Sequence, residues 1–192
     1  GQSVAEDGKI EYYTVFKCNG YEYKSNSLQF TLETCPHENL VTENGVVTCD
    51  TCGFCLIAQV ETADGEVTYY DDITKAATAA AENEGSTLKL VSRDQTGDTV
   101  TISGGKFTID LAGVPALYEF NITGGDVTFK SSEEFRSSDL CNITVNGSDA
   151  KVTIDGNIEL ETVQIFDGTL TINGTETYIE ELSIAGGKAD ID

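Results

Sequence analysis

Short runs in which apolar and polar residues alternate, interrupted by glycine pairs, fill the second half of the chain. Each unit consists of one alternating run, a Gly-Gly, Asn-Gly or Asp-Gly pair, and a second alternating run. The units occupy residues 100–111, 120–129, 143–154, 163–172 and 182–191. Equivalent positions lie about twenty residues apart, a period typical of solenoids. The pattern therefore predicts stacked turns of two short strands, each with one buried and one wetted face.

The glycine pairs permit two arrangements of these strands. Glycine supplies the positive φ of a two-residue hairpin, which would give an antiparallel sandwich or meander. It equally permits a bend between parallel layers, and the near-constant spacing favours such layers because similar residues then stack. We expect the following apolar residues to face inward and stack: Ile102, Ile109, Ile122, Val127, Val145, Val152, Ile154, Ile165, Ile172 and Ile184.

The segment before the first unit predicts an end cap. Residues 59–70 have the pattern of a hairpin that turns at Asp64 and Gly65. Residues 72–84 predict a helix that Asp71 or Asp72 caps. The apolar face of this helix consists of Ile73, Ala76, Ala77 and Ala80. Such a helix would cover the open end of a solenoid, whose backbone edge otherwise pairs with other chains.

The order of motifs from Tyr69 to the end of the chain carries a resemblance. A Tyr-x-Asp-Ile-x-x-Ala-x-x-Ala-Ala run, a glycine, and Thr-Leu-Lys-Leu follow one another. This order resembles the entry to right-handed parallel β-helices of the pectate-lyase-like superfamily. The resemblance implies a mostly β fold, a right-handed parallel β-helix with one N-terminal capping helix. It implies no particular activity.

Residues 1–34 predict a β-hairpin. Residues 7–16 predict a turn and a first strand, and residues 21–32 a returning strand after a tight turn at Cys18-Asn19-Gly20. The Gly-x-x-x-Tyr-Tyr entry and the Ser-Asn-x-Leu-x-Phe-x-Leu run resemble the last two strands of an immunoglobulin-like domain of bacterial surface proteins. Two strands cannot bury a sandwich core. We therefore expect the hairpin to pack on the next segment of the chain, to pair with another copy, or to be partly disordered.

Residues 35–58 contain a candidate metal-binding module. Cys35 and His37 precede an Asn-Gly turn, and Cys49 and Cys52 follow it. A Cys-x-x-Cys-Gly segment turns so that both sulfurs face one point, and the earlier Cys and His complete the four ligands of a closed, structural zinc site. The motif also resembles short Cys-x-His and Cys-x-x-Cys-Gly modules between domains of surface proteins of Gram-positive bacteria.

Disulfide bonds are the alternative for these cysteines in an oxidising compartment. Cys18 and Cys55 lie outside the proposed quartet, and a bond between them would join the amino-terminal hairpin to the module. A redox role for Cys49 and Cys52 is disfavoured, because no βαβ pattern surrounds them. Cys141 begins a strand and is expected to be a small buried apolar residue.

The acidic balance of the chain narrows the class of partner. There are 33 acidic and 11 basic residues among 192, a formal net charge of −22. This charge argues against nucleic acid, whose binding rests on Lys and Arg, and against anionic membranes. It favours cationic partners or divalent metal ions. No apolar run approaches the length of a membrane span, so membrane insertion is not expected.

Charged residues at equivalent positions of the units are the candidates for catalysis. One outward column is expected to contain Asp110, Lys130, Asp155, Asn173 and Asp192. A second is expected to contain Lys106, Asp126, Thr169 and Lys188. Carboxylates two layers apart lie roughly 9.5 Å apart, within the range of inverting glycosidases. The mixed signs instead favour solvated ladders that avoid like-charge repulsion, since no His base or aromatic platform accompanies the acids.

Together these features predict domains at 1–34, 35–58 and 59–192, within a piece of a longer, secreted or cell-wall-attached bacterial protein. We expect a non-catalytic, adhesin-type surface domain that holds structural zinc and presents a rigid β-helix to a host protein or glycan. The ends of the chain are candidates for self-association. The alternative is a polysaccharide hydrolase or lyase that uses Asp110 and Asp155 on the β-helix flank.

Overall fold

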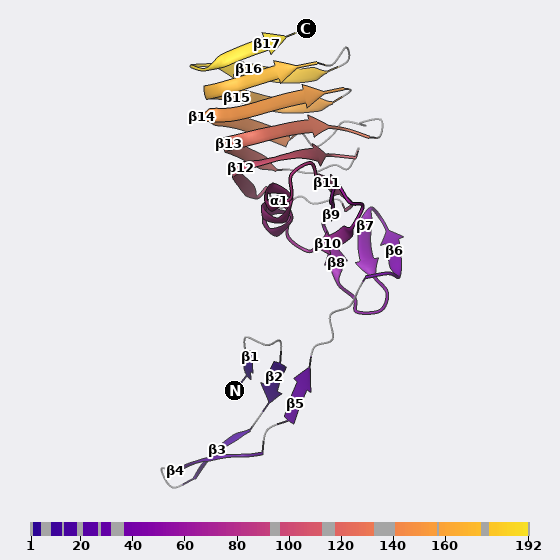
Figure 1. Ribbon diagram of the computed structural model, residues 1–192. Helices are drawn as coiled ribbons and strands as arrows, with labels where there is room; N and C mark the ends of the chain where they lie inside the picture. Colours follow the sequence, from indigo (N-terminus) through magenta and orange to yellow (C-terminus); the bar gives the residue numbers. More distant parts are fainter. Residues whose placement is uncertain are drawn as a thin grey trace. The chain divides into compact units, whose positions relative to one another are not determined.

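The computed structural model (Figure 1) describes residues 2–4, 9–12, 14–18, 21–26, 28–31, 37–92, 97–112, 118–132, 141–156, 158–173 and 177–191. The chain divides into two compact units, Gly1–Pro36 and His37–Asp192.

The first unit consists of short antiparallel strands. β1 (Gln2–Val4), β2 (Lys9–Tyr12) and β5 (Leu28–Thr31) form one sheet, and β3 (Val15–Cys18) pairs with β4 (Tyr21–Lys24). Pairing of β2 with β5 and of β3 with β4 confirms the predicted antiparallel hairpin, although its turn residues 19–20 lie outside the described ranges. The immunoglobulin-like character of this segment stays a prediction.

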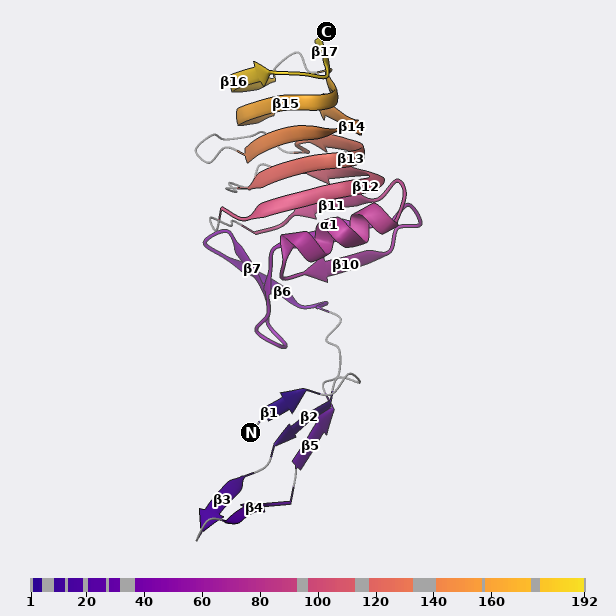
Figure 2. The ribbon, with the colours of Figure 1, turned by 90° about the vertical axis from the view of Figure 1, so that its left-hand side faces the viewer.

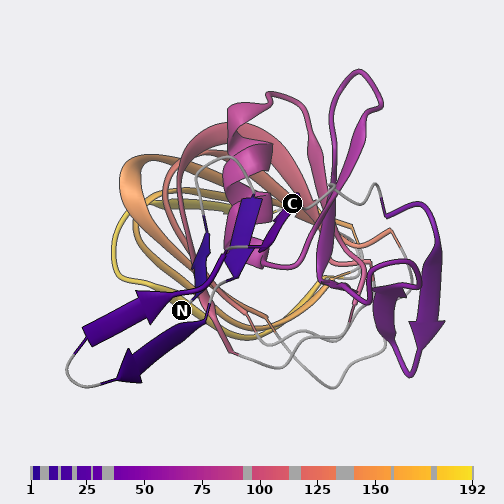
Figure 3. The same cartoon turned by 90° about the horizontal axis from the view of Figure 1, so that it is seen from below.

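The second unit is dominated by a parallel β-helix. Its strands are β11 (Thr87–Leu90), β12 (Thr99–Asp110), β13 (Glu119–Lys130), β14 (Cys141–Asp155), β15 (Glu159–Ile172), β16 (Tyr178–Ile184) and β17 (Lys188–Ile191). Each strand from β11 to β15 pairs in parallel with the next, and β16 and β17 both pair with β15. Seen from below, the successive turns superpose (Figure 3). The predicted solenoid is therefore confirmed, whereas its right-handed sense stays a prediction.

The interior of the solenoid follows the repeat in the sequence. In register, Ile102 pairs with Ile122, Ile122 with Val145, Val145 with Ile165 and Ile165 with Ile184. Nine of the ten predicted inward residues are buried. Ile184 is the exception, because it stacks on Ile165 as expected but is 51% exposed. Among the described residues, no further turn covers it.

Glycine bends, not hairpin turns, connect the two halves of β12, β13 and β15. Gly105, Gly125 and Gly168 have φ values of +88°, +92° and +89°. A Cβ atom at Gly125 would lie 2.7 Å from the carbonyl carbon of Gly104 in the turn below, so the layers touch backbone to backbone at the corner. The parallel pairing on both sides of the bend excludes the antiparallel sandwich.

An antiparallel hairpin and a helix cover the first turn (Figure 2). β9 (Ala58–Glu61) pairs with β10 (Val67–Tyr70) and, on its other side, with β11, while α1 (Ile73–Glu82) packs on β12. The carboxylate of Asp72 accepts hydrogen bonds from the backbone N–H groups of Thr74 and Lys75, at 2.7 and 3.0 Å. The four residues predicted for the apolar face of the helix are all buried. The predicted cap is thus confirmed, with the hairpin as an additional layer.

Among the described residues, no helix has the length and apolar character that crossing a membrane requires.

Candidate metal centre and polar groove

The cysteine-rich module folds as a small antiparallel sheet within the second unit. β6 (Leu40–Glu43), β7 (Val46–Cys49) and β8 (Cys55–Leu56) form its strands. At the knuckle, the N–H of Gly53 donates to the carbonyl of Cys49 at 2.7 Å, and the N–H of Cys49 donates to the carbonyl of Phe54 at 2.9 Å. Gly53 has φ +72° with open space where a Cβ would lie. Glycine is therefore needed for its conformation, as the Cys-x-x-Cys-Gly motif predicts.

Three of the four predicted metal ligands lie together. The ligand atoms of His37, Cys49 and Cys52 are all within 4.8 Å of one another. The Nδ1 atom of His37 lies 3.5 Å from the Sγ atom of Cys52. Tetrahedral coordination of zinc by one nitrogen and one sulfur would separate these atoms by roughly 3.6 Å. The group could hold a metal ion, and Cys35, the predicted fourth ligand, lies outside the described residues.

Four cysteines of the described segments are not joined to one another by disulfide bonds. They are Cys49, Cys52, Cys55 and Cys141, with Cys49 buried and Cys52 exposed. Cys141 is 2% exposed at the start of β14, as predicted. Burial raises the pKa of its thiol to about 11, opposed by a hydrogen bond with the backbone of Tyr118. Cys141 is therefore a packing residue.

Direct contacts fix the module to the β-helix. The backbone N–H of Val47 in β7 donates to Oγ of Ser92 at 2.7 Å, and Ser92 is 1% exposed. The N–H of Val91 donates to the carbonyl of Ile57 at 2.9 Å. Leu56 in β8 is fully buried. The metal-binding group therefore sits on an element whose backbone is tied to the first turn of the solenoid.

One of the two predicted outward columns is partly wrong. Asp110, Lys130 and Asp155 do pair in register. Asp110, however, is only 4% exposed, and its Oδ1 atom accepts hydrogen bonds from the backbone N–H groups of Ala112 and Ser132, both at 2.9 Å. The carboxylate thus ties its own turn to that of the next layer. A carboxylate two residues before a turn is a sequence signal for this arrangement.

The rest of that column and the second column lie on the surface. Asp155 and Asn173 are exposed, and Asp192 falls outside the described ranges. In the second column Lys106 pairs in register with Asp126, and their charged groups are 3.5 Å apart. Lys151 follows Asp126 in this column, and the repeat pattern did not predict it because the turn after Asn146 contains extra residues. Opposite charges alternate here, as predicted for solvated ladders.

A column of stacked threonines runs between the two charged columns. Consecutive pairs in register are made by Thr87, Thr108, Thr128, Thr153 and Thr171. All five are half-buried. Their β-branched side chains suit a pleated, half-buried strand surface, which accounts for their recurrence.

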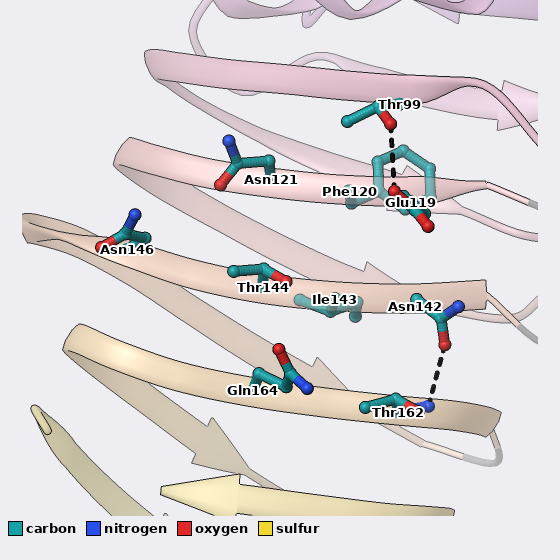
Figure 4. A pocket seen from close by; sticks show the side chains of 10 residues that line it. All are labelled: Thr99, Glu119, Phe120, Asn121, Asn142, Ile143, Thr144, Asn146, Thr162 and Gln164. Atoms are coloured by element: carbon teal, nitrogen blue, oxygen red, sulfur yellow. Dashed lines mark hydrogen bonds between the residues drawn. The ribbon is translucent and has the colours of Figure 1, made fainter. Parts of the chain in front are cut away.

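The first halves of β12 to β15 form a second surface, which we call the polar groove (Figure 4). It encloses about 490 Å³. The described residues that line it are Thr99, Glu119, Phe120, Asn121, Asn142, Ile143, Thr144, Asn146, Thr162 and Gln164. No motif in the sequence distinguishes these residues, because only the strand register brings them together and only one of them is ionisable.

Two rows of side chains make up the groove (Figure 4). The outer row lies near the beginnings of the strands and consists of Thr99, Glu119, Asn142 and Thr162 (Figure 4). Within it, Thr99 donates to the Glu119 carboxylate at 3.0 Å, and the backbone N–H of Thr162 donates to Oδ1 of Asn142 at 3.1 Å. The inner row consists of Asn121, Thr144 and Gln164, paired in register on successive strands. The outer row is held by internal hydrogen bonds, whereas the inner row presents amides and a hydroxyl.

Comparison of the chain with models of protein families, with curated proteins and with solved structures gives no match. The metal-binding group and the groove are therefore the features from which a function can be inferred.

Proposed function

We propose that this chain is a non-catalytic binding module of adhesin type, in which a rigid β-helix presents one face to a host protein or glycan outside the cell. The observation that carries the proposal is the polar groove, a concave surface that is built on regular strands and has a volume of about 490 Å³. Strands hold side chains more precisely than loops do, because their rotamers are fixed by neighbours in the sheet. The extracellular location follows from the resemblance of the cysteine module to surface proteins of Gram-positive bacteria.

The hydrolase alternative is weakened by the surroundings of its candidate acids. A glycosidase needs two carboxyl groups that both face the scissile bond. The Oδ1 atom of Asp110 accepts two backbone hydrogen bonds, and the residue is 4% exposed, whereas Asp155 is exposed. Lys130 lies between them in register. The contacts of Asp110 are those of a turn-stabilising carboxylate.

We propose further that the metal is zinc and that its role is structural. Cys and His are the ligand types of closed tetrahedral zinc sites, and Cys35 supplies the fourth ligand. The module that carries this group is joined to the β-helix through Ser92 and Ile57. Zinc would hold the turns of the module in place and so stiffen the entry to the solenoid.

Screening against polysaccharides tests the function. The protein is incubated with a panel of neutral and acidic polysaccharides, and both retention and new reducing ends are measured. Asp110→Asn and Asp155→Asn variants are the controls. Binding without cleavage supports the proposal. Cleavage that disappears in these folded variants would establish the enzyme in place of the binding module.

Elemental analysis tests the zinc proposal. Purified protein should contain about one zinc per chain, and removal of the metal by a chelator should lower the thermal midpoint, because the metal contributes directly to folding. A Cys52→Ser variant should lose the metal, whereas a Cys55→Ser variant should keep it. Zinc retained by Cys52→Ser, or absent from the wild type, would refute the site.

A further inference from the structure

The charge of the polar groove differs from that of the whole chain. The chain carries a formal net charge of −22, yet Glu119 is the one ionisable residue among the ten described residues that line the groove. Its Oε2 atom already accepts a hydrogen bond from Thr99. A surface selected to bind cations or basic peptides would concentrate the acidic side chains of such a chain. The groove instead displays neutral hydrogen-bonding groups.

As far as its described lining shows, the groove also lacks the apolar centre of a protein interface. Stable protein interfaces have a core depleted of polar groups and enriched in aromatic side chains. The two apolar residues of the lining, Phe120 and Ile143, are 1% and 0% exposed and belong to the solenoid interior. The groups that the groove offers a partner are therefore mainly amides and hydroxyls.

One residue of the inner row has an unsatisfied hydrogen-bond acceptor. Within the described part of the chain, the Oδ1 atom of Asn121 is buried without a hydrogen-bond partner. If this amide turns toward the groove, no hydrogen bond at Oδ1 is broken. A ligand hydroxyl that donates to Oδ1 would remove the free-energy cost of an unpaired acceptor. Thr144 and Gln164 continue the row on the next two strands, at intervals of roughly 4.8 Å. This interval is close to the length of one sugar unit in an extended chain.

We propose that the ligand is a neutral, hydroxyl-rich glycan that lies along the solenoid axis over Asn121, Thr144 and Gln164. This inference rests on the proposed binding function and names its ligand class and surface. Sugar hydroxyl groups both donate and accept hydrogen bonds, which matches a row of two amides and a hydroxyl. An acidic glycan is rejected by the negative charge of the protein and of Glu119.

β14 provides a matched pair of variants for the test. Thr144 and Thr153 are both half-buried, outward residues of this strand, one in the groove and one in the threonine column on the other face. Thr→Val removes a hydroxyl and keeps the shape and the strand preference. Affinity electrophoresis in gels containing galactomannan, glucomannan or mixed-linkage β-glucan measures binding, with polygalacturonate as the acidic comparator. The thermal midpoint of each variant checks its folding.

A neutral polysaccharide should retard the wild type, and polygalacturonate should not. Thr144→Val should weaken the binding about 3- to 10-fold, the effect of one lost hydrogen bond, and Thr153→Val should leave it unchanged. Asn121→Leu should also weaken binding without lowering the thermal midpoint, since its Oδ1 atom forms no hydrogen bond within the described residues.

Other results separate this inference from the proposed function. Equal retardation of Thr144→Val and Thr153→Val would overturn the groove as the surface but leave a glycan-binding module. Binding of polygalacturonate or of a protein, with no retardation by any neutral polysaccharide, would overturn the ligand class alone. New reducing ends in the gel would overturn the proposed function itself.

Discussion

Replacement of Gly125 by alanine tests how closely the turns of the β-helix are stacked. A Cβ atom at this position would lie 2.7 Å from the carbonyl carbon of Gly104 and 2.7 Å from the carbonyl oxygen of Gly105. Both contacts are with backbone of the neighbouring turn, which cannot move aside without shifting a whole layer. Gly125→Ala therefore combines the strain of a positive φ with overpacking.

Gly156→Ala is the matched control for this variant. Both glycines have φ +92°, but nothing lies within 4 Å of a Cβ atom at Gly156. The positive φ costs an alanine about 1 to 2 kcal/mol at either site. Overpacking at Gly125 adds about 1 to 3 kcal/mol. The difference between the two variants isolates the contact between turns.

Thermal unfolding followed by circular dichroism measures the difference. For a chain of this size, 1 kcal/mol corresponds to a shift of about 2 to 4 °C in the thermal midpoint. Gly156→Ala should lower the midpoint by about 2 to 8 °C, and Gly125→Ala should lower it by about 2 to 12 °C more. Equal midpoints for the two variants would refute backbone-to-backbone packing at the corners.

Two sets of substitutions and one labelling experiment test the helix cap, the contacts of Asp110 and the burial of Cys141. Asp72→Ala should lower the free energy of unfolding, measured by chemical denaturation, by about 0.5 to 2 kcal/mol through loss of the helix cap. Asp71→Ala, which removes an exposed ion pair with Lys75, should have little effect in the same assay. Asp110→Ala should lower the free energy of unfolding by about 2 to 4 kcal/mol, because two backbone N–H groups lose a charged acceptor, and Asp110→Asn should cost less in the same assay because its amide oxygen still accepts. The raised pKa of about 11 keeps the Cys141 thiol protonated at pH 8. Iodoacetamide should therefore label exposed Cys55 and leave Cys141 unlabelled until the protein unfolds, as measured by peptide mass spectrometry. Labelling of Cys141 in the native protein would contradict its burial.

The sequence predicted those features that depend on local periodicity. Side chains alternate across a strand, so the apolar positions of each unit specify which residues stack, and Ile102 to Ile165 do stack. A helix cap at Asp71 or Asp72 follows from local chemistry in the same way, and the structure places it at Asp72. The Cys-x-x-Cys-Gly motif likewise predicted the knuckle, and the structure brings His37 to it.

Features that depend on contacts between turns could not be predicted from a single unit. Asp110 is buried because Ser132, in the next turn, donates to it, and no pattern within one unit contains that contact. The polar groove is a product of register, since Asn121, Thr144 and Gln164 are ordinary outward residues until their strands are aligned. Exposure of Ile184 likewise depends on what covers the last described turn, not on its own unit.

Glycan binding in the polar groove is tested most directly by a crystal structure of the protein with a neutral oligosaccharide. We predict an intact sugar chain lying across β13, β14 and β15, in hydrogen-bonding contact with Asn121, Thr144 and Gln164. A sugar bound over the threonine column at Thr128 and Thr153, or a cleaved sugar beside Asp110, would contradict this prediction.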